Sequence, residues 1–150
     1  DQGESWVALL EKAYAQVQGS YQNTEYGNAD EAFDMLQASD ADAWTGSFVP
    51  SQVRYVHLIT ALNDRRPIVA TTFSKASAEA RPILDQYRVS LNHCYAIVGV
   101  ADGKVTLHNP WGHTHANVAF EHLPMLLQAI SFGRAESATA GRHGMAPPKR

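Results

Sequence analysis

The stretch LNHCYAIVGVADGKVTLHNPWG, residues 91–112, predicts two strands joined by a tight turn. Residues 94–100 form an apolar run rich in Tyr, Ile and Val, and residues 104–108 alternate apolar with polar side chains. The Asp-Gly pair between these runs is a common turn signal. We expect a hairpin with a three-residue loop, residues 101–103, in which Gly103 takes the left-handed conformation that such a loop requires.

The length of this loop decides which side chains share a face of the hairpin. A three-residue loop pairs Tyr95 with Asn109 and His93 with Trp111, so His93 lies one same-face step from Asn109. A two-residue Asp-Gly turn would shift the pairing by one residue and send Asn109 to the other face. An Asn beside a His fixes the ring orientation and tautomer of an imidazole that acts as the base for a nearby Cys, which it holds as a thiolate. The pattern therefore indicates a base and its orienter.

Two blocks of this stretch resemble the calpain family of papain-like cysteine proteases. LNHCYAIVGV is similar to the segment that carries the catalytic His in that family, and HNPWG to the segment that carries the catalytic Asn and an adjacent Trp. The segment WVALLEKAYAQVQGSY, residues 6–21, also resembles the helix that opens the His/Asn half of calpain cores. The likeness covers roughly residues 5–134, and two blocks in the right order are more specific than either alone.

The resemblance implies roles for three residues. His93 is the general base, Asn109 its orienter, and Trp111 a shield over the hydrogen bond between them. In the family, the half that bears the catalytic Cys and the oxyanion-hole Gln comes before this segment. The one Cys of this chain, Cys94, points away from His93 on a strand, and we interpret it as a core thiol. We therefore expect the chain alone to be inactive.

Two functions are compatible with these observations. The first is the His/Asn half of a calpain-like cysteine endopeptidase core, which needs a Cys-bearing protease subdomain as partner and acts on a peptide or protein substrate. The alternative is a catalytically inactive calpain-like binding module, a pseudopeptidase within a multidomain effector or toxin. The expected fold is α+β, with helices packed on a twisted, mainly antiparallel sheet over residues 1–136, followed by a flexible tail at residues 137–150.

Charge and hydropathy argue against other classes of protein. The chain has 12 basic and 15 acidic residues and a net charge of −3, which offers no electrostatic footprint for nucleic acid or an anionic membrane. No apolar run approaches the roughly 20 residues of a membrane-spanning helix, so we expect a soluble chain. A single Cys excludes an internal disulfide.

Two clusters raise the question of a metal. Calcium is possible by family resemblance, because calpain cores bind it through loop carboxylates and carbonyls, and the candidate cluster here is Asp30, Glu31, Asp34, Asp40 and Asp42. These residues lack a fixed ligand spacing, so we favour solvated loops and helix ends. Zinc could bind among His108, His113, His115 and His122. No Cys or carboxylate stands at ligand spacing, so we favour ordinary loop histidines.

The remaining elements are expected to support the hairpin. The sequence predicts helices at residues 6–19, 28–37, 51–64 and 121–128, strands at residues 67–73 and 117–120, and an edge strand at residues 129–135. Ser51 is the expected cap of the third helix. Residues 74–90 show no clear periodicity, so we interpret them as a long loop, with at most one turn of helix at residues 76–80.

Overall fold

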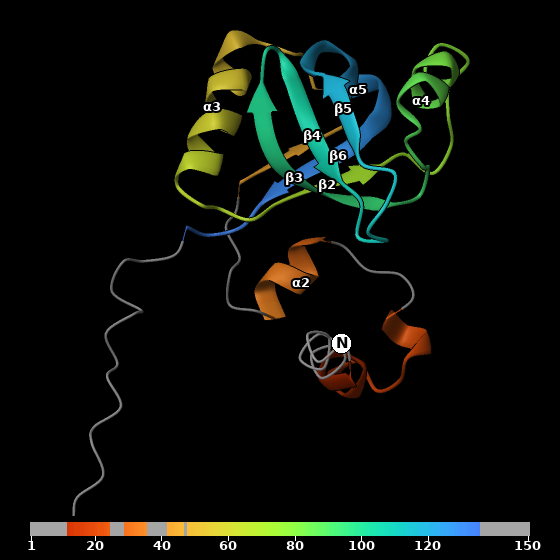
Figure 1. The fold of residues 1–150 in the computed structure, drawn as a ribbon. Coiled ribbons are helices and arrows are strands. Elements are labelled where there is room, and N and C mark those ends of the chain that lie inside the picture. The colour runs from red at the N-terminus through yellow and green to blue at the C-terminus, as the bar shows by residue number, and fades with distance from the viewer. Residues whose placement is uncertain (1–11, 25–28, 36–41, 47, 136–150) are drawn as a thin grey trace, which may run out of the picture.

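The computed structural model of the chain describes residues 12–24, 29–35, 42–46 and 48–135. In this part of the chain, a six-stranded sheet has the order β1-β6-β2-β3-β4-β5, and each pair of neighbouring strands is antiparallel. The helical residues 52–63, 81–87 and 123–126 lie beside the sheet (Figure 1). The predicted α+β fold with a mainly antiparallel sheet is therefore confirmed.

The elements have the following bounds. The strands are β1 (Ala43–Thr45), β2 (Ile68–Thr72), β3 (Cys94–Ala101), β4 (Lys104–His108), β5 (Ala116–Ala119) and β6 (Leu127–Phe132). The helices are α2 (Ala29–Met35), α3 (Gln52–Asn63), α4 (Arg81–Tyr87) and α5 (Leu123–Leu126), with short 3-10 turns η1 (Gln22–Thr24) and η2 (Phe120–His122). Residues 12–17 are also helical. No helix in these described segments is long and apolar enough to cross a membrane.

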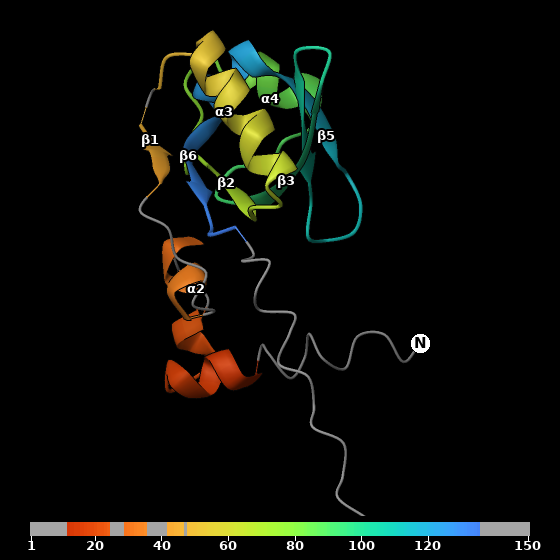
Figure 2. The same ribbon diagram turned by 90° about the vertical axis from the view of Figure 1, so that its left-hand side faces the viewer.

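Helix α3 forms where its sequence predicts it. The side chain of Ser51 accepts a hydrogen bond from the Arg54 N–H at 3.3 Å, which satisfies one of the free donors of the first turn. Leu58 and Ala61 are buried, and the helix lies across the sheet between β1 and β5 (Figure 2). Burial of a Leu side chain contributes about 1.5–3 kcal/mol, so this contact helps to fix the sheet behind it.

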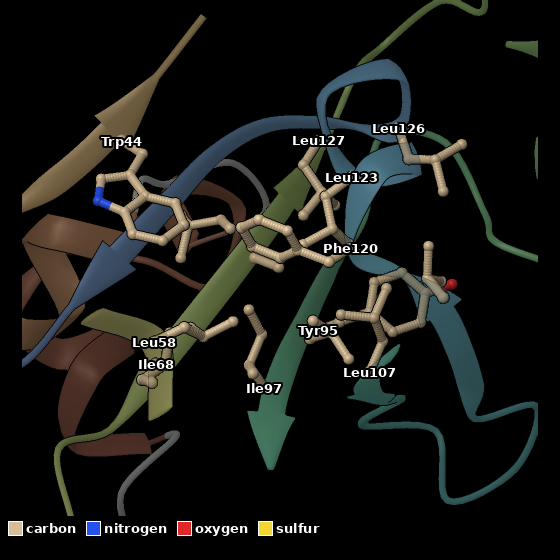
Figure 3. Packing of buried hydrophobic residues seen from close by; sticks show 14 of the residues in the cluster. Trp44, Leu58, Ile68, Tyr95, Ile97, Leu107, Phe120, Leu123, Leu126 and Leu127 are labelled. Atoms are coloured by element: carbon tan, nitrogen blue, oxygen red, sulfur yellow. The ribbon is translucent and has the colours of Figure 1, made fainter. Parts of the chain in front are cut away.

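The hydrophobic core lies between one face of the sheet and the helices α3, α4 and α5. Side chains alternate along the strands, and in β2 the residues Ile68, Ala70 and Thr72 are the buried ones. Tyr95 and Ile97 of β3 belong to the same core (Figure 3). The strands that lead to His93 and Asn109 are therefore held by a packed interior.

Residues 74–90 contain a helix, so the prediction of a long loop is wrong. Helix α4 has Pro82 in its first turn, where a missing N–H costs nothing, and its C-cap, Arg88, is in the left-handed conformation with φ 54°. It spans seven residues and buries Leu84. Its seven residues make about two turns, and Ile83, Leu84 and Tyr87 pack toward the core at helical spacing. So short a pattern does not stand out in the sequence from a loop with scattered apolar residues.

The end of the predicted C-terminal helix and the position of the last strand also need correction. The helical segment stops at Leu126, and β6 begins at Leu127 instead of residue 129. Strand β6 pairs with β1 on one side and β2 on the other, so it is not an edge strand. The start of the predicted first helix, the residue that would cap the helix at residues 28–37, and the tail at residues 137–150 lie outside the described residues.

Candidate active site

The side chains of His93 and Asn109 meet at one end of the β3–β4 hairpin. Atom Nε2 of His93 lies 3.0 Å from Oδ1 of Asn109. His93 immediately precedes β3, and Asn109 immediately follows β4. The expectation that these two side chains touch is therefore confirmed, although the hairpin achieves it differently from the prediction.

The turn of the hairpin has two residues, so the predicted three-residue loop is wrong. Ala101 pairs with Lys104, and Asp102 and Gly103 both have positive φ, 51° and 72°. Two consecutive left-handed residues match the right-handed twist of the strands. Taken alone, this turn would place Asn109 on the face away from His93.

A bulge in β3 restores the predicted pairing. The register shifts between Ile97, which pairs with Leu107, and Gly99, which pairs with Thr106. Val98 is thus one extra residue on β3, and it compensates for the missing loop residue. Below the bulge Ala96 pairs with His108, the same register that a three-residue loop would give.

Thr72 holds the main chain of His93 from the neighbouring strand. Its Oγ1 accepts a hydrogen bond from the His93 N–H at 2.9 Å and donates one to the His93 carbonyl at 3.0 Å. The Thr72 N–H donates to the same carbonyl at 2.9 Å. Thr72 is 2% exposed, so these bonds form away from competing water and restrict the backbone at His93.

Asn109 is fully buried and begins a tight turn through Pro110, Trp111 and Gly112. Its Oδ1 accepts a hydrogen bond from the Trp111 N–H at 3.0 Å, and its carbonyl accepts one from the Gly112 N–H at 3.1 Å. An Asn side chain that bonds the backbone two residues ahead is a common turn device. Here it also fixes the amide so that its oxygen faces His93.

The direction of this amide sets the tautomer of the imidazole. Because Oδ1 can only accept, Nε2 of His93 must donate the proton between them. In a neutral ring, Nδ1 then carries the free lone pair, and it is the nitrogen that can act as a base. The arrangement can therefore accept a proton at a defined atom and in a fixed ring orientation.

Trp111 covers the imidazole on one side. Its ring centroid lies 4.3 Å from that of His93, with an interplanar angle of 42°. The ring of Tyr95 meets His93 edge-on at 4.9 Å. Trp111 is nevertheless 60% exposed, so it is a lid over the ring and not a core residue.

Comparison with known sequences shows the family to which the chain belongs. The sequence model of the family described as "Calpain family cysteine protease" matches residues 1–131.

The chain belongs to the calpain family of cysteine proteases.

Three relatives show the extent of the similarity. Calpain-9 of Homo sapiens is 25% identical over 78% of this chain and 18% of its own length. Calpain-8 of Rattus norvegicus is 30% identical, and the calpain-1 catalytic subunit of Homo sapiens 28% identical, each over 73% of this chain and 16% of its own length. The chain thus spans less than a fifth of the length of these calpains.

Cys94 does not join His93 and Asn109. Its Sγ lies 3.7 Å from Oγ1 of Thr71, the residue paired with it across the strands, on the face opposite Thr72. The side chain is half-buried, so the interpretation as a core thiol is wrong. Its side chain does point away from the imidazole of His93, as expected for the next residue along a strand.

One carboxylate of the calcium candidate and two imidazoles of the zinc candidate are engaged in other contacts, and Asp40 lies outside the described residues. The Asp42 carboxylate lies 2.9 Å from Nη1 of Arg66 and 3.0 Å from Nε2 of His57. The rings of His108 and His115 are stacked at 4.1 Å and 21°, so their lone pairs do not converge on one ion. Among the described residues, no group of three potential ligands is placed to hold a metal.

Two residues of the site were missed by sequence reasoning. Thr72 could have been found, because alternation within the predicted strand at residues 67–73 places it on the inner face beside the His93 strand. His115, whose Nδ1 accepts a hydrogen bond from the Asn109 N–H at 3.0 Å, was considered only as a zinc ligand. No local pattern indicates its contact, which depends on the course of the loop after Gly112.

Proposed function

We propose that this chain supplies the base and the orienter of a calpain-type cysteine protease active site. In this proposal the nucleophilic Cys comes from a segment outside these 150 residues. The observation that carries the proposal is the 3.0 Å contact between His93 Nε2 and Asn109 Oδ1 under the ring of Trp111. Family membership supports the reaction class, and the geometry supports the role of each residue.

The proposed chemistry uses the free nitrogen of His93. Nδ1 takes the proton of the incoming Cys thiol, and the thiolate attacks the peptide carbonyl to form a tetrahedral intermediate. The imidazolium then gives its proton to the leaving amine, which leaves an acyl-enzyme. Water, deprotonated by Nδ1, hydrolyses the acyl-enzyme and regenerates the thiol. Throughout the cycle Oδ1 of Asn109 accepts a hydrogen bond from Nε2–H of His93 and keeps Nδ1 directed at the reacting atoms.

The chain by itself should not carry out this reaction. Its one Cys lies on the other face of β3, and a strand side chain cannot cross to the opposite face without a change of register. The partner required by the proposal is therefore a Cys-bearing protease subdomain, and the substrate is a peptide or protein segment bound between the two parts.

The test is peptide cleavage by the full-length polypeptide that carries this chain. Wild type should cleave a fluorogenic peptide, and His93→Ala should lose about 100-fold or more of kcat, the usual contribution of a general base. Lys104→Ala is the matched control, because Lys104 is exposed at the opposite end of the hairpin. It should cleave like wild type. The assay is run with and without calcium, so that a dependence on the ion is detected.

Two results would contradict the proposal. Cleavage that survives His93→Ala unchanged would remove His93 from the base role. A full-length wild type that cleaves nothing under either condition would favour the alternative, a catalytically inactive binding module, and capture of a peptide by that protein would then be the next measurement.

A further inference from the structure

His115 occupies a defined position beside the candidate site. The last pair of the β4–β5 ladder is Leu107 with Ala116, and His108 and His115 are the next two residues across from each other. Their rings stack at 4.1 Å. Beyond this point the ladder ends, and the backbone N–H of Asn109 must find another partner.

That partner is the imidazole of His115. Nδ1 of His115 accepts the Asn109 N–H at 3.0 Å. Asn109 is fully buried, and a buried backbone N–H without an acceptor costs free energy. The bond therefore stabilises the turn even though the His115 side chain that accepts it is exposed. We propose that His115 is a positioning residue, which holds the backbone of Asn109 and thereby the orientation of His93.

The other contacts of Asn109 show why one outside anchor is needed. Its Oδ1 and its carbonyl accept hydrogen bonds from Trp111 and Gly112, which belong to the same tight turn. These bonds lie within the turn, which is otherwise joined to the sheet through the end of β4 and through the contact of Oδ1 with His93. His115 connects the turn to the start of β5, so it limits how far Oδ1 can move relative to the His93 ring. A shift of about 1 Å at such a position can cost about 100-fold in rate.

The contact also defines the state of the His115 ring. Nδ1 must be unprotonated to accept, so the proton of the neutral ring lies on Nε2. The stacked ring of His108, at an interplanar angle of 21°, helps to hold the ring plane. The acceptor function and the stacking function can therefore be separated by substitution.

Three variants make this separation. His115→Phe keeps an aromatic ring against His108 but places a carbon where Nδ1 accepts. His115→Asn loses the ring but keeps an acceptor, because its Oδ1 is the same number of bonds from Cα as Nδ1 of His. His108→Phe is the matched control, since it preserves a stacked ring and leaves His115 intact.

The first measurement is amide hydrogen exchange in the isotope-labelled chain, followed by NMR. His115→Phe should speed exchange at the Asn109 and Trp111 N–H groups by about tenfold, which is the effect of losing one typical hydrogen bond. His115→Asn and His108→Phe should stay close to wild type. Unchanged exchange in His115→Phe, or equally fast exchange in His115→Asn, would overturn the proposal.

The second measurement, on the full-length protein, rests on the proposed function. His115→Phe should lower kcat with little change in KM, and His115→Asn should recover most of the loss, which a purely structural role would not produce. An unchanged kcat in His115→Phe would overturn the link to catalysis. If exchange changes as expected but wild type cleaves no peptide, the anchoring of Asn109 stands and the protease proposal fails. If wild type cleaves peptide but exchange in His115→Phe is unaffected, the protease proposal stands and the anchoring role of His115 fails.

Discussion

His93 reaches Asn109 because the hairpin that joins them has one residue more on its first strand than on its second. The turn is one residue shorter than predicted, and the bulge at Val98 adds one residue to β3. Between the bulge and the site, the extra residue of β3 compensates for the shorter turn, so the strands pair there in the predicted register. The 3.0 Å contact between His93 and Asn109 therefore depends on the total length of the hairpin and not on the turn alone.

Deleting Val98 should preserve the contact between His93 and Asn109. Without it, Ile97 would be followed directly by Gly99, and the pairing on both sides of the bulge could remain as it is. Val98 is 54% exposed, so the free energy of unfolding should change by about 1 kcal/mol or less. The amide exchange of the Trp111 N–H, which bonds Oδ1 of Asn109, reports whether the site survives.

A deletion on the other strand provides the contrast. Removing Thr106 would shift the rest of β4 by one residue and send Asn109 to the opposite face. We expect this variant to lose the protection of the Trp111 N–H. Similar behaviour of the two deletions, whether tolerated or not, would show that this bulge does not set the register of the site.

The hydroxyl of Thr72 should be important for both stability and the site. Thr72→Val keeps the shape but loses both side-chain hydrogen bonds to the backbone of His93. A buried N–H left without a partner costs about 1–3 kcal/mol, and urea unfolding should show a loss in this range. Thr72→Ser retains the hydroxyl and should lose less. Equal losses in the two variants would mean that the methyl group, and not the hydroxyl, is responsible.

Asn109 should contribute more to activity than to stability. Its Nδ2 is buried and has no hydrogen-bond partner among the described residues, which offsets the favourable bonds of Oδ1. Asn109→Ala should therefore change the free energy of unfolding by less than about 1 kcal/mol. It should reduce kcat of the full-length protein by about tenfold or more, because the imidazole loses its fixed orientation.

The control for this variant is Asn117→Ala. Asn117 is an exposed Asn on β5 whose Oδ1 accepts a hydrogen bond from Thr106, so its loss should not reduce kcat. A large loss of stability in Asn109→Ala with unchanged kcat would assign Asn109 a structural role only.

The hairpin was predictable because its signals are local. Alternation of apolar and polar residues and the Asp-Gly pair define the two strands and the turn within one short segment. These signals do not fix the length of the loop, since Asp-Gly suits both two-residue and longer loops. Gly99 inside an otherwise apolar strand is a signal of a bulge that the sequence does contain. A bulge predicted at Gly99 would have favoured the two-residue turn that the structure has.

The position of β6 was not predictable for a different reason. A strand lies inside or at the edge of a sheet according to partners that come from distant parts of the chain. Its outer neighbour β1 has three residues and precedes it by more than 80 positions. A segment as short as β1 shows no alternation of apolar and polar residues. The sequence therefore contains no sign that another strand pairs with the outer side of β6.

The candidate site follows the same division. His93, Asn109 and Trp111 belong to recognisable blocks and were identified from them. Thr72 and His115 act through the backbone of these residues. Alternation in the predicted strand indicates the face on which Thr72 lies, but no residue spacing indicates either backbone contact. Side chains that face the chemistry are therefore easier to infer from sequence than side chains that hold the backbone in place.

Cys94 offers a direct test of where the nucleophile comes from. Its Sγ contacts Oγ1 of Thr71 at 3.7 Å, on the face of β3 away from His93, so Cys94→Ser in the full-length protein should cleave peptide at the wild-type rate. The replacement is close in size and keeps a polar contact with Thr71, so the fold should be retained. If Cys94→Ser abolishes cleavage as completely as His93→Ala, the nucleophile lies within this chain, and β3 must change register when substrate binds. If cleavage persists and is still blocked by a thiol-alkylating reagent, the reacting Cys belongs to another part of the protein.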